Sequence, residues 1–236
     1  MVGGEVPARA LDDLAERVRP VTLAHHQRVA VLPQLETLLP EGLPQGAVVA
    51  VAAAPGVTGT MTLALALAAG PSLAGAWVAA VGTRSLGLAA AAELGVALER
   101  LVVVDPQARS KGVAAVLAAL VDGFDVVVVG PAARLRLRSR DTRRLVARVR
   151  ERGAVVVGVG DDLPGGSAQI RLLVTASTWE GIDQGAGHLQ TRRTTVEVAG
   201  RGAASRSRQV QLRFPLTDEE EGEDRVVPLP LRQQSA

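Results

Sequence analysis

The chain has 236 residues, of which 47% are hydrophobic and only 2% aromatic, so Ala, Val and Leu have to build the core. Its 26 basic and 24 acidic residues nearly balance, and the absence of cysteine excludes disulfides, thiolate catalysis and cysteine-bound zinc. No uncharged apolar run reaches the length of about 18 residues that a transmembrane helix needs. The N-terminus lacks the pattern of a signal peptide, and we expect a cytoplasmic protein with no membrane partner.

The first 30 residues predict one helix followed by a connector. Helical periodicity runs over residues 8–19, where Leu11, Leu14 and Val18 share one face. In the connector, His25 and His26 are adjacent, so their side chains would not face each other on a helix. No cysteine or third clustered histidine completes a site, and we interpret the pair as surface residues rather than metal ligands.

From residue 47 onward, apolar strands alternate with helical stretches. Continuous β-branched runs separated by helices are typical of a parallel sheet covered on both faces, which predicts an α/β fold. Trp77 falls inside one of these runs and is expected in the core. The predicted strands are 47–53, 76–81, 101–104, 125–129 and 154–158, and the predicted helices are 60–69, 86–94, 111–121 and 139–152.

The last third of the chain changes character. Residues 171–177, 194–199 and 208–214 alternate apolar and polar side chains, which predicts half-exposed, antiparallel strands. Beyond Pro215 the chain is acidic and contains proline, and we expect it to be mobile. The expected organisation is an N-terminal helix and connector (1–30), an α/β core (31–165), a strand extension (166–214) and an acidic tail (215–236).

The turn between the first strand and helix has the setting of a phosphate-binding loop without its residues. A working loop reads Gly-x-x-x-x-Gly-Lys-[Ser/Thr], in which the lysine contacts phosphates and the hydroxyl contacts Mg²⁺. Here Ala54 replaces the first glycine, Gly59 remains, Thr60 replaces the lysine and Met61 replaces the hydroxyl residue. The helix N-terminus still favours an anion, but an ordinary strand-to-helix turn explains the loop as well. We predict no cofactor and no bound metal.

The segment 39–46, the following strand and the degenerate loop resemble the entry to the ATPase core of RecA-type recombinases. The resemblance covers about residues 31–160 and implies a RecA-like P-loop NTPase fold with a mostly parallel central sheet. It places the water-activating acid at Thr83 and the Mg²⁺-ordering aspartate at Gly130. Because the phosphate cation, both metal contacts and the water activator are replaced together, the resemblance implies a pseudo-ATPase with no catalytic residues.

A narrower resemblance rests on the decayed motifs, the short N-terminal helix and the arginine-rich extension. Residues 178–189, the pair Arg192-Arg193 and residues 200–204 are similar to ImuA-type accessory proteins of bacterial mutagenesis cassettes, in their actinobacterial branch. This resemblance implies a non-catalytic assembly or regulatory role in SOS-induced translesion DNA synthesis. The implied partners are an inactive Y-family polymerase homologue (ImuB-type) and, through it, an error-prone C-family DNA polymerase, with RecA and DNA as further candidates.

Two sets of arginines are candidates for contact with nucleic acid. Arg134, Arg136 and Arg138 would share one face if the segment is extended. Arg140, Arg144 and Arg148 recur every four residues and form one stripe on the predicted helix. One interpretation is that the stripe contacts DNA phosphates and displaces their counterions. The other is that it is the solvated face of a helix, with its arginines paired to nearby acids. Two alternative functions follow: a DNA-binding modulator of RecA filaments, and an ATP-dependent recombinase-like enzyme.

The extension contains the candidates for a partner interface. Trp179 lies among polar and glycine residues, where it is either an interface anchor or a cap on the sheet edge. The other candidates are Arg192, Arg193 and Arg201.

Overall fold

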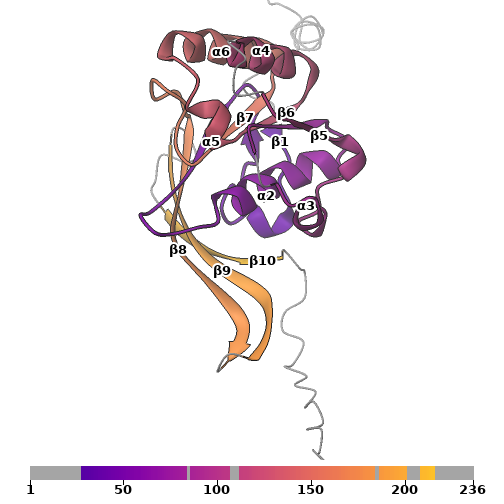
Figure 1. The fold of residues 1–236 in the computed structure, drawn as a ribbon, viewed down its shortest axis with the longest axis vertical. Helices are drawn as coiled ribbons and strands as arrows, with labels where there is room; N and C mark the ends of the chain where they lie inside the picture. The colour runs from indigo at the N-terminus through magenta and orange to yellow at the C-terminus, as the bar shows by residue number, and fades with distance from the viewer. Residues whose placement is uncertain (1–27, 84–85, 107–111, 184–185, 201–207, 216–236) are drawn as a thin grey trace, which may run out of the picture.

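The computed structural model describes residues 28–83, 86–106, 112–183, 186–200 and 208–215. Its centre is an eight-stranded sheet in the order β10-β9-β8-β3-β7-β6-β4-β5 (Figure 1). These strands are β3 (Val48–Ala53), β4 (Val78–Val81), β5 (Leu101–Val104), β6 (Val126–Val129), β7 (Val155–Val159), β8 (Ile170–Asp183), β9 (Ala186–Gly200) and β10 (Arg208–Phe214). A separate antiparallel pair joins β1 (Arg28–Val29) to β2 (Leu43–Pro44).

The six strands from β5 to β8 are parallel, and only the β8–β9 and β9–β10 pairs are antiparallel. The predicted α/β class with antiparallel C-terminal strands is therefore confirmed. The prediction was wrong for one strand, because β8 pairs in parallel with β3 on one side and antiparallel with β9 on the other. The alternating residues Ile170, Leu172 and Val174 are buried, so half of this strand belongs to the core of the parallel sheet.

Helices cover both faces of the sheet. The helices α2 (Thr60–Leu73) and α3 (Leu88–Glu93) pack on one face, and α4 (Val113–Gly123), α5 (Pro131–Arg134) and α6 (Ser139–Arg152) pack on the other (Figure 1). Side chains alternate along β3, so Val49 and Val51 join the first cluster while Val48 joins the second. Two short 3₁₀ helices, η2 (Pro33–Leu35) and η3 (Leu98–Arg100), complete the described elements. None of the helices in the described ranges is long and apolar enough to cross a lipid bilayer.

The predicted bounds agree closely where a pattern is strong. The strand 101–104 and the helix 139–152 are found with the predicted bounds, and the other core elements differ by a few residues at their ends. The helix α5 was not predicted, and it begins at Pro131, whose fixed φ suits the first position of a helix. The predicted helix 8–19, the pair His25-His26 and the tail from residue 216 lie outside the described residues.

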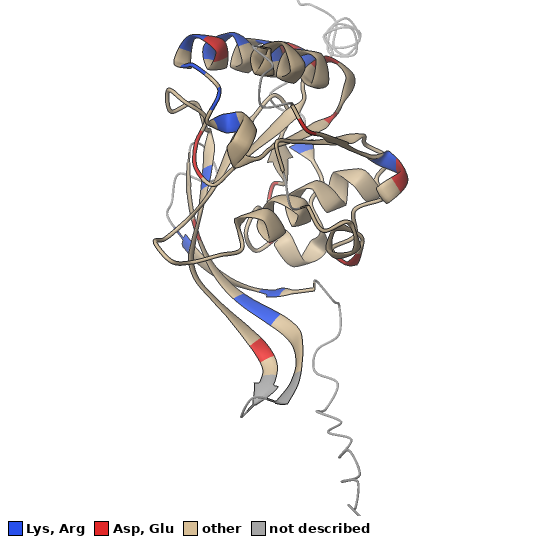
Figure 2. Cartoon of the chain, in the orientation of Figure 1, with Lys and Arg blue, Asp and Glu red and all other residues tan. Residues whose placement is uncertain are grey.

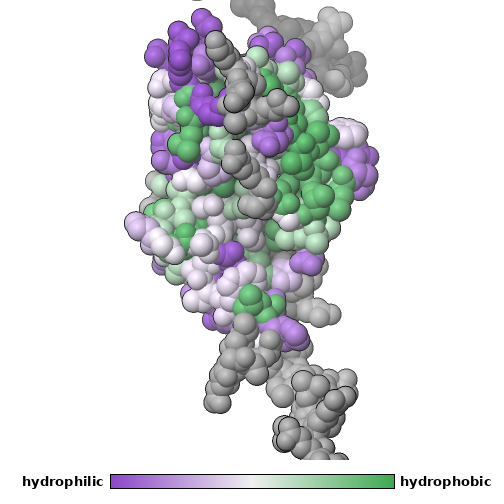
Figure 3. All heavy atoms as spheres, viewed as in Figure 1, coloured by the Kyte–Doolittle hydropathy of each residue, from purple (hydrophilic) through white to green (hydrophobic). Residues whose placement is uncertain are grey.

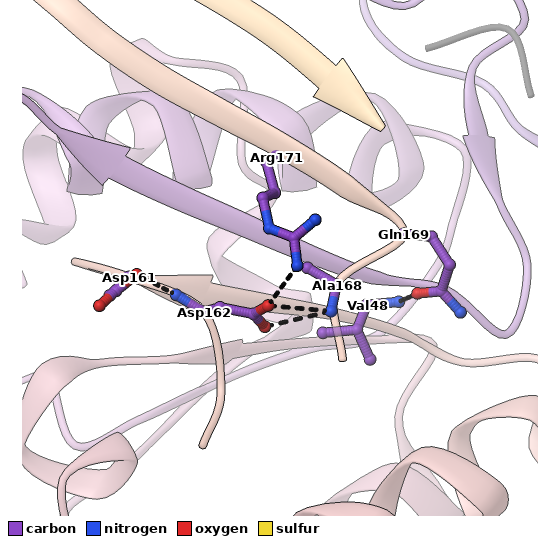
Figure 4. A network of polar contacts seen from close by, with 6 residues as sticks. All are labelled: Val48, Asp161, Asp162, Ala168, Gln169 and Arg171. Carbon is purple, nitrogen blue, oxygen red and sulfur yellow. Dashed lines mark hydrogen bonds and ion pairs between the residues drawn. The ribbon is translucent and has the colours of Figure 1, made fainter. Parts of the chain in front are cut away.

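The connection from β7 to β8 crosses β3 without a helix, and polar contacts hold it in place (Figure 4). The Asp162 carboxylate accepts the backbone N–H of Ala168 at 3.1 Å and pairs with Arg171 at 3.1 Å. The Gln169 side chain accepts the backbone N–H of Val48 at 2.7 Å. These contacts set the start of β8 beside the start of β3 and thereby bring the C-terminal strands into the core sheet.

Trp77 corrects another prediction, because its side chain is 45% exposed rather than in the core. The strand begins one residue later, at Val78, and the Trp77 backbone N–H donates to the Asp125 carboxylate at 2.8 Å. The indole packs edge-on against Phe124, with the ring centres 6.4 Å apart. A position just before a strand can point to the rim of the sheet even when the strand itself is buried.

The outer edge of β5 is an exposed apolar surface. Val102 and Val103 are 36% and 46% exposed, and Leu88 and Leu98 on the neighbouring helices are also exposed. Figure 3 shows this apolar surface beside β5 and α3. It lies at the opposite end of the sheet from β10.

Candidate functional site

The degenerate loop lies between β3 and α2, where the sequence predicts it. The Ala54 N–H donates to Val174 O of β8 at 2.9 Å, and the Val57 N–H donates to Ala54 O at 2.9 Å. Gly59 is the N-cap of α2, with φ of 119° and no side-chain capping bond, and the first turn of α2 contains no acidic residue. The positive end of a 14-residue helix therefore faces the loop without a carboxylate from its own first turn.

An arginine from the C-terminal extension lies against the loop at the N-terminus of α2. The Arg192 side chain starts on β9, crosses β8 and reaches the loop, where its Nη2 donates to Thr58 Oγ1 at 2.5 Å. Its Nε donates to Ser177 Oγ at 2.6 Å, and its Nη1 lies 3.5 Å from Thr62 Oγ1. A Cβ atom at Gly59 would lie 3.1 Å from Nη2, so the loop and the guanidinium are in close contact.

The charge of Arg192 is buried and is not neutralised by the described residues. The residue is only 7% exposed, and burial lowers the pKa of its guanidinium below its ordinary value. None of the ion pairs among the described residues includes Arg192, and its hydrogen-bond partners are neutral hydroxyls. A protein cation therefore lies where a phosphate-binding loop would receive its ligand.

Thr83 and Gly130, the two positions where the resemblance places catalytic acids, come together at the ends of β4 and β6. The Gly130 N–H donates to Val81 O at 2.8 Å. A Cβ at Gly130 would lie 2.4 Å from Gly82 O and 2.9 Å from Thr83 Cγ2, so no side chain fits there unless the backbone moves. Thr83 is buried, and its Oγ1 has no hydrogen-bond partner among the described residues. The segments after β4 and β6 therefore meet in a tight contact.

The predicted arginine stripe is on the exposed face of α6, a helix with several basic residues (blue in Figure 2), but acids neutralise part of the stripe. Arg148 and its neighbour Arg152 both pair with Asp122 of α4, at 2.7 and 3.0 Å. The hydrogen bond from Arg148 is the main cause that holds the pKa of Asp122 below its ordinary value.

The remaining members of the stripe differ from one another. Arg140 lies 3.7 Å from Asp141, whereas Arg144 has no ion pair within the part of the chain that the structure describes. An open groove between α4 and α6 is lined by Ala114, Ala118, Arg144 and Arg148, among others. Arg144 is therefore the member of the stripe whose charge is not paired with an acid among the described residues.

The expectation that Arg134, Arg136 and Arg138 share one face of an extended segment was wrong. Arg134 ends the helix α5, and its Nε is buried with no hydrogen-bond partner within the described ranges. Arg136 lies in the following turn and donates to Pro106 O at 3.2 Å, while Arg138 is exposed at the N-cap of α6. The helix α5 begins at Pro131, directly after Gly130. Residues two apart in sequence share a face in a strand but not in a helix, so these three side chains do not lie on one side.

The extension candidates lie on different sides of its strands. Trp179 on β8 is 51% exposed, and the Arg192 guanidinium carbon lies 5.3 Å from its ring centre. Arg193 pairs with Glu180 at 2.7 Å, and Arg213 of β10 lies 3.9 Å from the same carboxylate. Arg201 lies outside the described residues.

Arg192 was predicted to lie at a partner interface, and its contact with the loop was missed. One signal in the sequence could have indicated its burial: it shares the alternation of Thr194, Val196 and Val198, which all face the core. Its partners Thr58 and Thr62 are 134 and 130 residues away, and no local pattern links them to β9.

Comparison with known proteins assigns the chain to a family. A family model described as the MT3502 N-terminal domain matches residues 37–165, more than half of the chain. "Uncharacterized protein Rv3395c" of Mycobacterium tuberculosis is 37% identical over 127 residues, which are 53% of this chain and 52% of that protein. The match thus spans about half the length of this relative, and the family match ends before β8 and Arg192. The chain belongs to the MT3502 N-terminal domain family, with a relative in an actinobacterium.

Proposed function

We propose that the chain is a non-catalytic, RecA-like assembly or regulatory protein of SOS-induced translesion DNA synthesis and mutagenesis. Its direct partner in this proposal is an ImuB-type, inactive Y-family polymerase homologue, and through it an error-prone C-family DNA polymerase. The observation that carries the non-catalytic role is Arg192, which fills the degenerate loop from within the chain. Phosphoryl transfer needs a positioned phosphate cation and a bound metal, and Gly130 has no space for a metal-binding carboxylate.

The arrangement of the sheet supports the RecA-like part of the proposal. The loops that follow β3, β4 and β6 leave the carboxyl ends of parallel strands and meet at one edge of the sheet. This is the edge where an α/β sheet binds its ligands, and the resemblance puts the nucleotide chemistry there. The sheet has this edge, but the residues that would bind phosphate and metal there are replaced. This combination suits a protein that uses the fold for assembly and not for catalysis.

The β8–β9 hairpin supports a role in binding a partner. It projects from the helical part of the molecule (Figure 1) and carries the half-exposed Trp179. On the other face of the same strands, Arg193, Glu180 and Arg213 form a charged group across three strands. An exposed tryptophan is typical of the anchor of a protein interface.

The experiment is co-purification of the ImuB-type homologue with the full chain. We expect Trp179→Ala to weaken capture by about tenfold or more, the usual cost of losing a central aromatic anchor. Trp77→Ala is the matched control, because Trp77 is the other tryptophan of the chain and is 45% exposed elsewhere. Circular dichroism confirms that both variants fold. Failure of the unmodified chain to capture the homologue contradicts the proposal, and equal capture by Trp179→Ala contradicts the hairpin interface.

A DNA-binding modulator of RecA filaments is the second candidate. It is favoured by the exposed face of α6, where Arg143, Arg144 and Arg150 have no ion pair among the described residues. An ATP-dependent enzyme is the third and has least support, since Arg192 and Gly130 occupy the two places that its chemistry needs. Assay of the full chain with ATP, Mg²⁺ and single-stranded DNA tests it, and turnover that disappears in Gly59→Ala supports catalysis.

A further inference from the structure

We infer that β5 is an interface between two copies of this chain, whose β5 strands pair antiparallel about a twofold axis at Val103. The described sheet ends at β5, and the strand Leu101–Val104 has β4 on one side only. β5 lies at the other end of the sheet from β8, β9 and β10. The inference therefore does not depend on the proposed function, whose interface is on the β8–β9 hairpin.

The first argument is that nothing in β5 prevents the addition of another strand. Natural edge strands are usually protected by charged side chains, by proline or by a bulge. The strand Leu101–Val104 contains no charged residue and no proline, and it pairs with β4 without a shift in register. The opposite edge strand, β10, carries the charged side chains Arg208 and Arg213. Of the two edges of the described sheet, β5 is therefore the one suited to pairing.

The second argument is the composition of the surface around β5. The exposed side chains Val102 and Val103 belong to an apolar surface to which Leu88 and Leu98 also contribute (Figure 3). The acids Glu99 and Asp105 are exposed at the two ends of the strand. An apolar centre with a polar rim is typical of a protein interface, and acids at both ends disfavour nucleic acid.

The third argument is the direction of the main-chain groups. The Gly82 N–H donates to Val104 O at 3.0 Å, so Val104 and, two residues before it, Val102 direct their N–H and C=O groups toward β4. The groups of Leu101 and Val103 therefore point outward. Opposite residues of an antiparallel pair either exchange both hydrogen bonds or exchange neither. A twofold pairing of β5 with itself must therefore be centred on one residue, either Val102 or Val103.

The neighbouring residues favour Val103 as the centre. A pairing centred on Val102 would need Arg100 in an extended conformation, but Arg100 belongs to the 3₁₀ helix η3. It would also bring Glu99 close to Asp105 of the other copy, and like charges that face each other destabilise a sheet. A pairing centred on Val103 involves only residues 101–105, which follow that helix.

In this register the two strands are complementary. Val103 lies opposite Val103 of the other copy, and the two residues exchange both of their hydrogen bonds. Val102 lies opposite Val104 of the other copy, in the pair whose side chains approach most closely. Pairs of β-branched side chains stabilise neighbouring strands, so the exposed valines gain contacts on both faces of the sheet.

The size of the surface sets the expected strength of the dimer. Interfaces of standard size bury about 800 Å² on each partner, and their affinities begin near micromolar. A four-residue strand with two exposed leucines beside it is smaller, so we expect a reversible dimer with a Kd on the order of 100 µM. Sedimentation velocity of the full chain from about 10 µM to 1 mM should follow the change from monomer to dimer. A monomer at every concentration would overturn the inference.

Cysteine crosslinking tests the register, because the chain has no cysteine of its own. In the inferred pairing the two Val103 Cα atoms are about 5.5 Å apart, a distance that a disulfide spans, so Val103→Cys should give a covalent dimer on mild oxidation. Val102→Cys is the matched control, since Val102 is also exposed but its two copies would be diagonal neighbours about 7–8 Å apart. We expect at least about fivefold more dimer from Val103→Cys. Equal crosslinking, or more from Val102→Cys, would overturn the pairing.

Exchange of charges at the same position gives a second test. Val103→Glu and Val103→Lys each put like charges opposite each other, and each should weaken self-association by about fivefold or more. An equal mixture of the two variants should form dimers again, because glutamate then faces lysine, and this recovery would also show that both variants fold. Failure of the mixture to form dimers would contradict the inference. Trp179→Ala should form dimers like the unmodified chain, and loss of the dimer in that variant would instead place the contact at the hairpin.

Discussion

The Arg192 guanidinium and the Thr58 hydroxyl lie 2.5 Å apart, although 134 residues separate them in the chain. Their hydrogen bond connects β9 to the loop before α2, and the bond to Ser177 connects both to β8. The loop is therefore held by a side chain of the protein, and the C-terminal hairpin and the core form one structural unit.

Truncating Arg192 should destabilise this unit. Arg192→Ala removes three hydrogen bonds and a buried stem, and we expect the free energy of unfolding to fall by about 2 kcal/mol in urea. Arg192→Met should cost less, because it keeps an unbranched apolar stem and removes an uncompensated buried charge. Arg193→Ala is the matched control on the exposed side, with an expected loss below about 1 kcal/mol. Equal losses for Arg192→Ala and Arg193→Ala would contradict the importance of the loop contact.

The two glycines of the loop should respond differently to alanine. Both have positive φ, 77° at Gly56 and 119° at Gly59, but only Gly59 has Arg192 next to its Cβ position. We expect Gly56→Ala to cost about 1 kcal/mol for the left-handed backbone alone, and Gly59→Ala to cost about 2–3 kcal/mol. Urea unfolding of the two variants measures the difference. The close packing described for Gly59 is refuted if the two costs are the same.

Placing an acid at Gly130 should fail to create a metal site. A side chain there meets the Gly82 carbonyl oxygen, so we expect Gly130→Ala to lose about 2–3 kcal/mol and Gly130→Asp at least as much. The variant Gly130→Asp should show no Mg²⁺-dependent ATP hydrolysis. Gly123→Ala is the control, because nothing lies within 4 Å of a Cβ at the end of α4. Full stability of Gly130→Ala would show that the site has room for a metal ligand.

Removing the unpaired hydroxyl of Thr83 should not harm the fold. Thr83 Oγ1 is buried and has no hydrogen-bond partner in the part of the chain that the structure describes, and an unpaired buried hydroxyl costs about 1–3 kcal/mol in lost hydration. We expect Thr83→Val, which has a similar shape, to leave the melting temperature unchanged or to raise it. Thr142→Val is the comparison, since the buried Thr142 hydroxyl donates to Arg138 O at 3.3 Å and its loss should destabilise. A lower melting temperature for Thr83→Val would indicate that its hydroxyl has a partner.

Asp122 should limit any binding of DNA by α6, because it pairs with Arg148 and Arg152. Asp122→Asn frees both arginines, so we expect stronger DNA binding at low salt and a salt slope steeper by about one to two. Asp105→Asn controls for net charge, as Asp105 has no ion pair among the described residues. Equal effects of the two substitutions would exclude a specific role for the stripe.

The same ion pairs define a pH dependence. The pKa of Asp122 is lowered below 3.8, so the pairs persist while the carboxylate is ionised and are lost as the pH falls through its folded-state pKa. DNA affinity of the unmodified chain should therefore not change through Asp122 between about pH 5 and 8.

Much of the fold follows from local patterns in the sequence. The runs of valine at β6 and β7 predict buried parallel strands, because they have no polar face to expose to water. The periodicity of α6 predicts its length and its exposed arginines. That Thr60 and Met61 stand where a phosphate-binding loop has lysine and a hydroxyl residue is a matter of residue identity and needs no structure. These features depend only on neighbours along the chain.

Contacts between distant segments required the three-dimensional structure. Alternation in β9 shows that Arg192 shares a face with buried residues, but not that this face meets the loop before α2. The parallel pairing of β8 with β3 depends on where the β7–β8 connection crosses the sheet. The closed contact of Gly130 with Gly82 depends on two strand ends meeting. Residue patterns thus determine which faces are buried and which residue types stand in the loop, whereas the crossings of the chain determine which segments meet. The reason is that many partners can bury an apolar face, while the hydrogen bond of 2.5 Å between Arg192 and Thr58 requires one particular partner.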